Sequence, residues 1–277
     1  MEKYVLAVGC SYTDKDFKSN KVEHEYFPKW PELLGNKLNM PVVNLGKCGA
    51  SNDWIEKTII DRIINDGYNI DLIVVGFTET WRYAVYNKWL FNPLTHIDEE
   101  IVKRHNDQHN YHVDNLNVMK TLKVPFNRHM VTALFCNYHI RKRENLFRVV
   151  VNNYIDTIVR LQKLCAFWDI KLIATNLVDA FEPIFYKYAT KITGNTWNIP
   201  MDEWCWAIEN SPNFYEVDEE TLIGWPNIKH LGGYSINHDI LKEEDKISPE
   251  KGDWHPNRQG HEKIAELYYE KYKEIYV

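Results

Sequence analysis

The sequence of 277 residues contains no apolar run near the ~20 residues that a helix needs to cross a bilayer. Its first residues, Met1, Glu2 and Lys3, lead directly into an apolar segment. A signal peptide would show a charged start, a longer apolar core and a small-residue cleavage site, and that pattern is missing. We therefore expect no membrane association and a cytoplasmic location.

Cysteine pairs at metal or redox spacing are also missing. The 5 cysteines are an odd number, widely spaced and without a CxxC pair, which predicts reduced thiols and no disulfide framework. Lysine and arginine form no dense stripe, and the formal net charge is -6. A basic surface for nucleic acid is therefore not expected. We also expect no cofactor.

Apolar and amphipathic segments alternate along the chain. Strands are predicted at residues 4–8, 42–45, 70–75 and 170–174. Helices are predicted at residues 30–38, 51–64, 146–167 and 257–272. This alternation predicts an α/β protein in which a parallel sheet lies between two helical layers. Ligands of such open sheets bind beyond the carboxyl ends of the strands.

Two long segments, 82–143 and 178–251, interrupt the alternation. Both greatly exceed the connections of ~2–6 residues that are common in α/β units. We predict a single domain over residues 1–277, with these segments as insertions that form a cap or lid. The second insertion is rich in tryptophan, which would either line a sugar-binding cleft or be buried and hold the lid: Trp197, Trp204, Trp206 and Trp225.

Three residue types needed for nucleophilic catalysis lie at the two ends of the chain. Ser11 follows the first predicted strand at a glycine turn, and Asp253 and His255 lie near the C-terminus. A serine hydroxyl needs an imidazole to accept its proton, and a carboxylate to orient that imidazole. Structural roles are the alternatives. Ser11 could cap the next segment, and Asp253 could cap the helix that starts near Pro256.

Four short motifs occur in a fixed order: GxS at residues 9–11, NxGxxG at 44–49, GxTE at 76–79 and DxHP at 253–256. The first three each follow a predicted strand. Over roughly the first eighty and the last twenty-five residues, this order resembles the four sequence blocks of the SGNH (GDSL-like) hydrolases. The resemblance implies a three-layer α/β/α, flavodoxin-like sandwich with a serine esterase or lipase-like activity.

The resemblance implies a role for each matching residue. Ser11 matches the nucleophile, His255 the general base and Asp253 its orienting carboxylate. The backbone N–H groups of Ser11 and Gly49 match the oxyanion hole. The family usually has Asn where this chain has Thr78, so a hydroxyl with a single proton would have to supply that donor.

Weaker candidates for substrate binding flank these motifs: Tyr12, Asn52, Glu79, Arg82 and Trp254. The alternative role of Arg82 is an ion pair with Glu79 across one helical turn. From the resemblance, we expect short acyl esters of carbohydrates, O-acetyl esters above all, as substrates. The resemblance also fits a divergent viral member, which would place the protein in the host cytoplasm or the virion.

Three other interpretations stay open at this point. The first is a non-catalytic SGNH-fold protein that binds carbohydrate or serves as a viral accessory module. In such a protein, Thr78 would mark the loss of a working oxyanion hole. A cysteine enzyme would need His255 to face Cys10 or Cys48. A zinc site would use histidines that lie close together in the first insertion: His105, His109 and His112.

Overall fold

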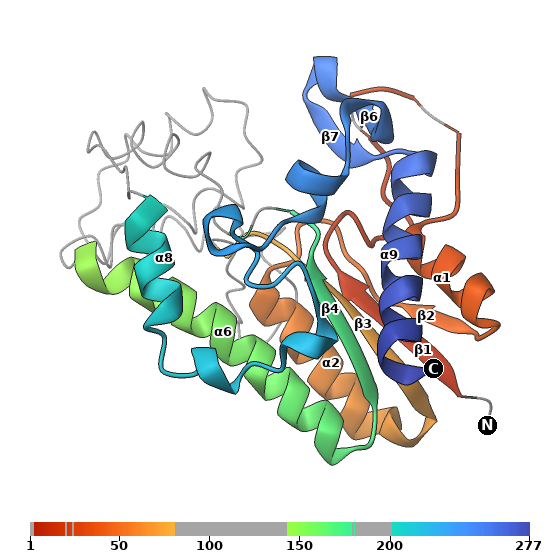
Figure 1. Cartoon of the computed structure of the whole chain (residues 1–277). Coiled ribbons are helices and arrows are strands. Elements are labelled where there is room, and N and C mark those ends of the chain that lie inside the picture. The colour runs from red at the N-terminus through yellow and green to blue at the C-terminus, as the bar shows by residue number, and fades with distance from the viewer. Residues whose placement is uncertain (1–2, 20, 24, 81–142, 179, 181–200) are drawn as a thin grey trace, which may run out of the picture.

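The structure, a computed structural model, describes residues 3–19, 21–23, 25–80, 143–178, 180 and 201–277 (Figure 1). Its centre is a five-stranded sheet in the order β2-β1-β3-β4-β5, and every neighbouring pair is parallel. The strands are β1 (Tyr4–Gly9), β2 (Val42–Asn44), β3 (Ile70–Phe77), β4 (Lys171–Asn176) and β5 (Leu222–Ile223). The predicted α/β class is confirmed.

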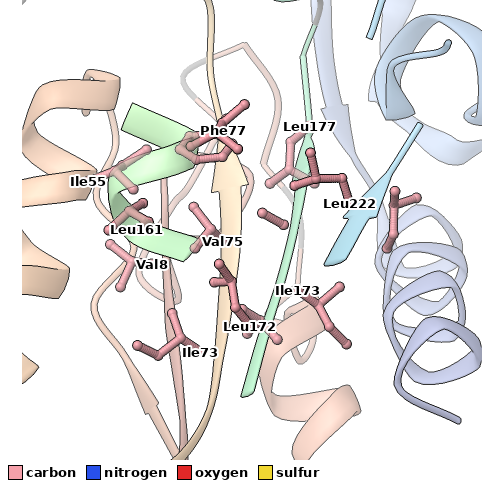
Figure 2. Packing of buried hydrophobic residues seen from close by; sticks show 14 of the residues in the cluster. Val8, Ile55, Ile73, Val75, Phe77, Leu161, Leu172, Ile173, Leu177 and Leu222 are labelled. Atoms are coloured by element: carbon pink, nitrogen blue, oxygen red, sulfur yellow. The ribbon is translucent and has the colours of Figure 1, made fainter. Parts of the chain in front are cut away.

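Helices cover both faces of the sheet. Helices α2 (Asn52–Asp66) and α6 (Arg143–Phe167) pack on one face, and α1 (Trp30–Leu38) and α9 (Arg258–Tyr276) pack together on the other (Figure 1). Because both faces are covered, β1 and β3 are apolar along nearly their whole length. Figure 2 shows the side chains of Val75 and Leu172 among this buried core.

Aromatic side chains fix α9 against the sheet and α1. The Tyr268 hydroxyl, which is fully buried, donates a hydrogen bond of 2.7 Å to the carbonyl oxygen of Val75 in β3. The Tyr268 ring also stacks on Trp30 in α1, with 4.4 Å between ring centroids. The C-terminal helix is thus tied to the centre of the sheet, and it carries the preceding hairpin with it.

Two helices begin at side chains that act as caps. The Ser51 hydroxyl accepts a hydrogen bond of 3.2 Å from the N–H of Trp54 and begins α2. Asn257 plays the same part for α9, since its Oδ1 accepts the N–H of Gly260 at 3.1 Å. Because Asn257 caps α9, the carboxylate of Asp253 is not needed for that role.

The two predicted insertions have different outcomes. The first, 82–143, lies outside the described residues except for Arg143, which begins α6. The second contains α8 (Met201–Glu209), which packs against α6, and also β5, which pairs with β4. Part of the range 178–251 is therefore sheet and not cap. A two-residue strand has no detectable period, which is why the sequence pattern did not reveal β5.

A two-stranded antiparallel hairpin, β6 (Lys246–Ser248) and β7 (Asp253–Pro256), lies at the carboxyl-end edge of the main sheet (Figure 1). Short helical turns connect the remaining segments: η1 (Gly67–Asn69), η3 (Phe214–Glu216), η4 (Glu219–Thr221), η5 (Lys229–Leu231), η6 (Ile236–Ile240), η7 (Glu243–Asp245) and η8 (Pro249–Lys251). Among the described helices, none combines the length and apolarity that crossing a membrane requires.

Candidate active site

The turn after β1 carries Ser11 at the carboxyl end of that strand. The N–H of Thr13 donates to the carbonyl oxygen of Cys10 at 2.9 Å and closes the turn. The Thr13 side chain packs directly beneath it, so that a Cβ on Gly9 would lie only 2.1 Å from Thr13 Oγ1. Glycine is required at position 9 by this close approach, and the tight turn leaves Ser11 6% exposed.

The side chains of Ser11, His255 and Asp253 form a continuous hydrogen-bonded chain. Ser11 Oγ lies 2.8 Å from His255 Nε2, and His255 Nδ1 lies 2.7 Å from Asp253 Oδ1. Strand β7 places Asp253 and His255 on the same side because side chains alternate along a strand. With a proton on Nδ1, the imidazole donates to Asp253 and leaves Nε2 to accept from the Ser11 hydroxyl.

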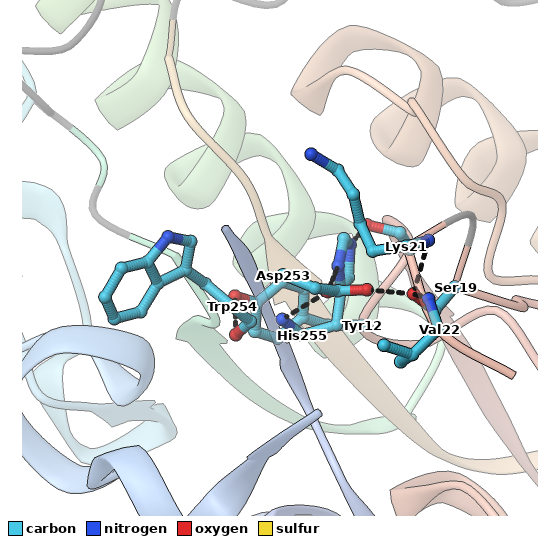
Figure 3. Close-up of polar contacts among 8 residues, drawn as sticks. Tyr12, Ser19, Lys21, Val22, Asp253, Trp254 and His255 are labelled. Atoms are coloured by element: carbon cyan, nitrogen blue, oxygen red, sulfur yellow. Dashed lines mark hydrogen bonds and ion pairs between the residues drawn. The ribbon is translucent and has the colours of Figure 1, made fainter. Parts of the chain in front are cut away.

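Asp253 is held as a carboxylate in a buried position. Its Oδ1 accepts the backbone N–H of His255 at 3.1 Å in addition to the ring, and its Oδ2 accepts the hydroxyl of Ser19 (Figure 3). Burial alone would raise the pKa of this carboxyl. The hydrogen bonds from the His255 ring, the Ser19 hydroxyl and the His255 backbone, with the charge of His255, lower the pKa to about 2. Asp253 is therefore ionised at neutral pH.

Two aromatic rings hold the imidazole of His255 in place. Phe17 stacks on it with 4.0 Å between centroids and 30° between planes, and Tyr12 packs against it at 5.1 Å. The Tyr12 hydroxyl donates a hydrogen bond of 2.9 Å to the carbonyl oxygen of Trp254. These contacts restrict rotation of the ring. Sequence reasoning missed Phe17 and Ser19, because both lie in a polar loop without a recognisable motif.

The two backbone N–H groups expected to form the oxyanion hole are those of Ser11 and Gly49. Gly49 has φ 81°, a conformation that favours glycine. The N–H of Lys47 donates to the carbonyl oxygen of Gly9 at 2.9 Å, which ties this loop to the end of β1. In the part of the chain that the structure describes, the N–H groups of Ser11 and Gly49 donate no hydrogen bond.

Thr78 does not present its hydroxyl as the sequence analysis expected. The residue is fully buried, and its hydroxyl donates to Glu79 Oε2 at 2.5 Å. Because a hydroxyl has one proton, this bond leaves none for an oxyanion. The amide of Asn52, expected to contact substrate, is instead buried on the Thr78 backbone, with bonds of 2.9 Å to its N–H and 3.0 Å to its carbonyl oxygen.

The His255 side chain opens onto a cleft of about 780 Å³. Three of the weaker candidates from the sequence, Tyr12, Glu79 and Trp254, line this cleft, whereas Arg82 lies outside the described residues. Trp254 is 46% exposed, and Figure 3 shows its indole extending away from Ser19. A volume of this size is within the range of about 300–1,000 Å³ that is usual for small-molecule sites.

The tryptophans of the second insertion lie elsewhere. Trp204 is buried on α8, and Trp225 packs against Phe214 with 5.8 Å between centroids. Trp206 is exposed on α8, and Trp197 lies outside the described residues. Of the four, the three that are described take no part in lining the cleft. The exposed aromatic surface beside His255 comes from Trp254.

The structure also bears on the thiol and metal interpretations. His255 Nε2 faces the Ser11 hydroxyl, while Cys10 is fully buried and Cys48 is exposed. Neither cysteine forms a disulfide with a described residue. The histidines considered for zinc, His105, His109 and His112, lie outside the described residues. His261, in α9, is buried and accepts the N–H of Trp30 on Nδ1 at 3.2 Å, which is a packing role.

Comparison with known proteins gives distant structural likenesses, of which two are described below. No family model and no curated protein matches the chain. A structure described as a lipolytic protein of the G-D-S-L family, from Desulfitobacterium hafniense DCB-2, is 12% identical, with a TM-score of 0.42 and coverage of 98% of this chain and 99% of that one. LAE5, an alpha/beta hydrolase enzyme from the metagenome of Lake Arreo, Spain, is 14% identical, with a TM-score of 0.37 and coverage of 97% and 94%. At these values, the likeness transfers no activity.

Proposed function

We propose that this chain is a serine ester hydrolase of the SGNH, or GDSL-like, kind. The observation that carries the proposal is the hydrogen-bonded chain from Ser11 through His255 to Asp253, with contacts of 2.8 and 2.7 Å. The three residues come from opposite ends of the sequence, and they meet at the carboxyl end of a parallel sheet. This is the edge at which α/β folds place their ligands.

The first half of the reaction forms an acyl-enzyme. Ser11 Oγ attacks the carbonyl carbon of the ester while His255 Nε2 takes the serine proton. The carbonyl oxygen becomes an oxyanion, which the N–H groups of Ser11 and Gly49 stabilise. Asp253 stabilises the imidazolium that forms. When the intermediate collapses, the bond to the leaving alcohol breaks, and His255 returns the proton to the alcohol oxygen.

The second half releases the acid. Water attacks the acyl-enzyme carbonyl while His255 accepts one of its protons. The second tetrahedral intermediate uses the same two N–H donors, and its collapse frees the carboxylic acid and returns the proton to Ser11. One ester and one water are consumed, and one acid and one alcohol are formed.

The proposed substrates are short acyl esters of carbohydrates, with O-acetyl esters as the leading class. The cleft of about 780 Å³ is large enough for a sugar unit beside the reacting ester. The exposed indole of Trp254 gives this cleft an aromatic surface, a common partner for sugar rings. The shortage of oxyanion donors at Thr78 favours a second candidate, a carbohydrate-binding protein that no longer catalyses.

The test measures hydrolysis of 4-nitrophenyl acetate by the wild type and by Ser11→Ala, with mass spectrometry after exposure to a serine-directed phosphonate. We expect turnover and a label on Ser11 in the wild type, and neither in the variant. Circular dichroism of both proteins shows whether the variant is folded. A folded wild type with no turnover and no label contradicts the hydrolase and favours the binding protein.

A further inference from the structure

The charged side chains of the cleft wall differ in how they are paired. Three carboxylates accept hydrogen bonds from the protein: Asp14 from the N–H of Cys48, Glu79 from Thr78, and Asp253 from His255 and Ser19. A further carboxylate of the wall, Asp16, is exposed. The lysines of the wall form no ion pair with any described residue: Lys18, Lys21 and Lys246. Among the described residues, these three cations thus lack a direct ion-pair partner, although four carboxylates share the wall with them.

Lys246 differs from the other two lysines because it is buried. It is 9% exposed, and its ammonium lies over the Trp254 ring, 5.1 Å from the centroid. The neighbouring acid Asp245 is already engaged, since its Oδ2 accepts Lys263 Nζ at 2.6 Å and the N–H of Lys242 at 3.0 Å. Burial lowers the pKa of Lys246, and the nearby acids Glu243 and Asp245 oppose that shift.

Lys246 belongs to the hairpin that carries the catalytic base. It lies in β6 and pairs with Pro256 of β7, the residue after His255. Its partner across the ring contact, Trp254, is the residue before His255. A group bound to Lys246 would therefore share one cleft with the reacting ester. Position, burial and charge all point to a ligand with a negative group.

We propose that Lys246, held against Trp254, is an anion subsite, and that the preferred ester carries a carboxylate, sulfate or phosphate group. The inference rests on the proposed hydrolase for its link to catalysis. A bound oxyanion would replace the water that Lys246 loses on burial, with a charge-assisted hydrogen bond. Short acyl esters of acidic sugars meet this requirement, because a sugar acid supplies both the ester oxygen and the negative group.

The test compares acetyl esters that differ in a single group. The probes are a mono-O-acetylated methyl glucuronoside and the matching methyl glucoside, together with the 6-sulfate and 6-phosphate of that glucoside. Acetate release is followed by NMR. In the wild type, we expect kcat/KM for at least one anionic ester to exceed that of the neutral ester by about tenfold or more. Comparison of the carboxylate, sulfate and phosphate probes shows which negative group on the substrate is preferred.

Variants assign this preference to Lys246. In Lys246→Gln the ratio of anionic to neutral kcat/KM should fall to about one, and Lys246→Arg should restore most of it, because the charge is retained. Lys251→Gln, an exposed lysine outside the cleft on the same hairpin, is the matched control and should keep the wild-type ratio. A wild type without preference, or a preference that survives in Lys246→Gln, overturns the subsite.

A binding measurement separates this inference from the proposed hydrolase. Ligand-observed NMR on Ser11→Ala, which cannot turn over, compares glucuronate with glucose. Glucuronate binding that disappears when Lys246→Gln is added supports the subsite even if no ester is hydrolysed. Ser11-dependent hydrolysis of 4-nitrophenyl acetate without any preference for anionic esters supports the hydrolase and rejects the subsite.

Discussion

The Ser19 hydroxyl donates a hydrogen bond to Oδ2 of Asp253, the carboxylate oxygen that His255 does not use. Ser19 comes from the loop after β1, so this bond links that loop to the hairpin that carries the base. The contact makes Ser19 a positioning residue, since it acts on catalysis through Asp253 and not on the substrate.

Replacing Ser19 with alanine should lower kcat about tenfold with little change in KM. The carboxylate would lose a charge-assisted hydrogen bond, a type of bond that contributes about 1.5–3 kcal/mol, and would orient His255 less firmly. Steady-state kinetics on 4-nitrophenyl acetate measure the change. Ser19→Thr keeps a hydroxyl and should recover most of the activity. Equal kcat values for Ser19→Ala and the wild type would remove Ser19 from this role.

Removing the hydroxyl of Thr78 should have a small effect on turnover. In Thr78→Val the kcat should stay within about threefold of the wild type, because the hydroxyl bonds to Glu79. Loss of an oxyanion-hole donor instead costs about a hundred- to a thousandfold. The free energy of unfolding should fall by about 1 kcal/mol for the lost hydrogen bond. A hundredfold loss of kcat in a folded variant would show that Thr78 turns to the oxyanion during the reaction.

Much of the main sheet could be predicted from the sequence, since long apolar runs and capping residues leave a local pattern. Helix α1 spans residues 30–38 as predicted, and Ser51 caps α2. The motifs also indicated the residue types that meet in the site. What could not be predicted is which side chains bond to one another. The bond of Ser19 to Asp253 spans 234 positions, and that of Thr78 to Glu79 replaces the expected donor geometry.

The low pKa of Asp253 predicts how stability changes in acid. In the native state the carboxyl pKa is about 2, whereas the ordinary value is 3.8. The unfolded chain therefore binds the proton first as pH falls. The stabilisation, about 1–2 kcal/mol once solvent screening is allowed for, is fully present above about pH 4 and is lost as pH falls towards 2.

Urea unfolding at several pH values tests this stabilisation. Asp253→Asn cannot ionise at this position. The amount by which its free energy of unfolding lies below that of the wild type should therefore narrow by about 1–2 kcal/mol between about pH 5 and pH 2. Ser11→Ala, which keeps the Asp253 carboxylate and its bonds to His255 and Ser19, is the control and should show no such narrowing. If the difference in free energy of unfolding between Asp253→Asn and the wild type stays constant over this range, the Asp253 carboxyl is not stabilised as an anion in the folded protein.

His261 also predicts how stability changes with pH. Asp253 is an acid that is charged in the folded protein, whereas His261 is a buried base that is uncharged there. Burial, with the charges of Lys29 and His255, lowers its pKa well below the ordinary value of 6.5. Its Nδ1 accepts the N–H of Trp30 at 3.2 Å and so carries no proton. The unfolded chain gains a proton on this side chain below about pH 6.5 while the native state does not, so stability falls as the pH is lowered.

NMR titration of the histidine rings measures this directly. The His261 resonances should not shift between about pH 8 and pH 5.5, a range in which exposed histidines titrate. In His261→Gln the wild-type loss of stability between about pH 7 and pH 5 should be reduced, since glutamine cannot take up the proton. A His261 ring that titrates within this range would show that the packing between α9 and α1 opens to water.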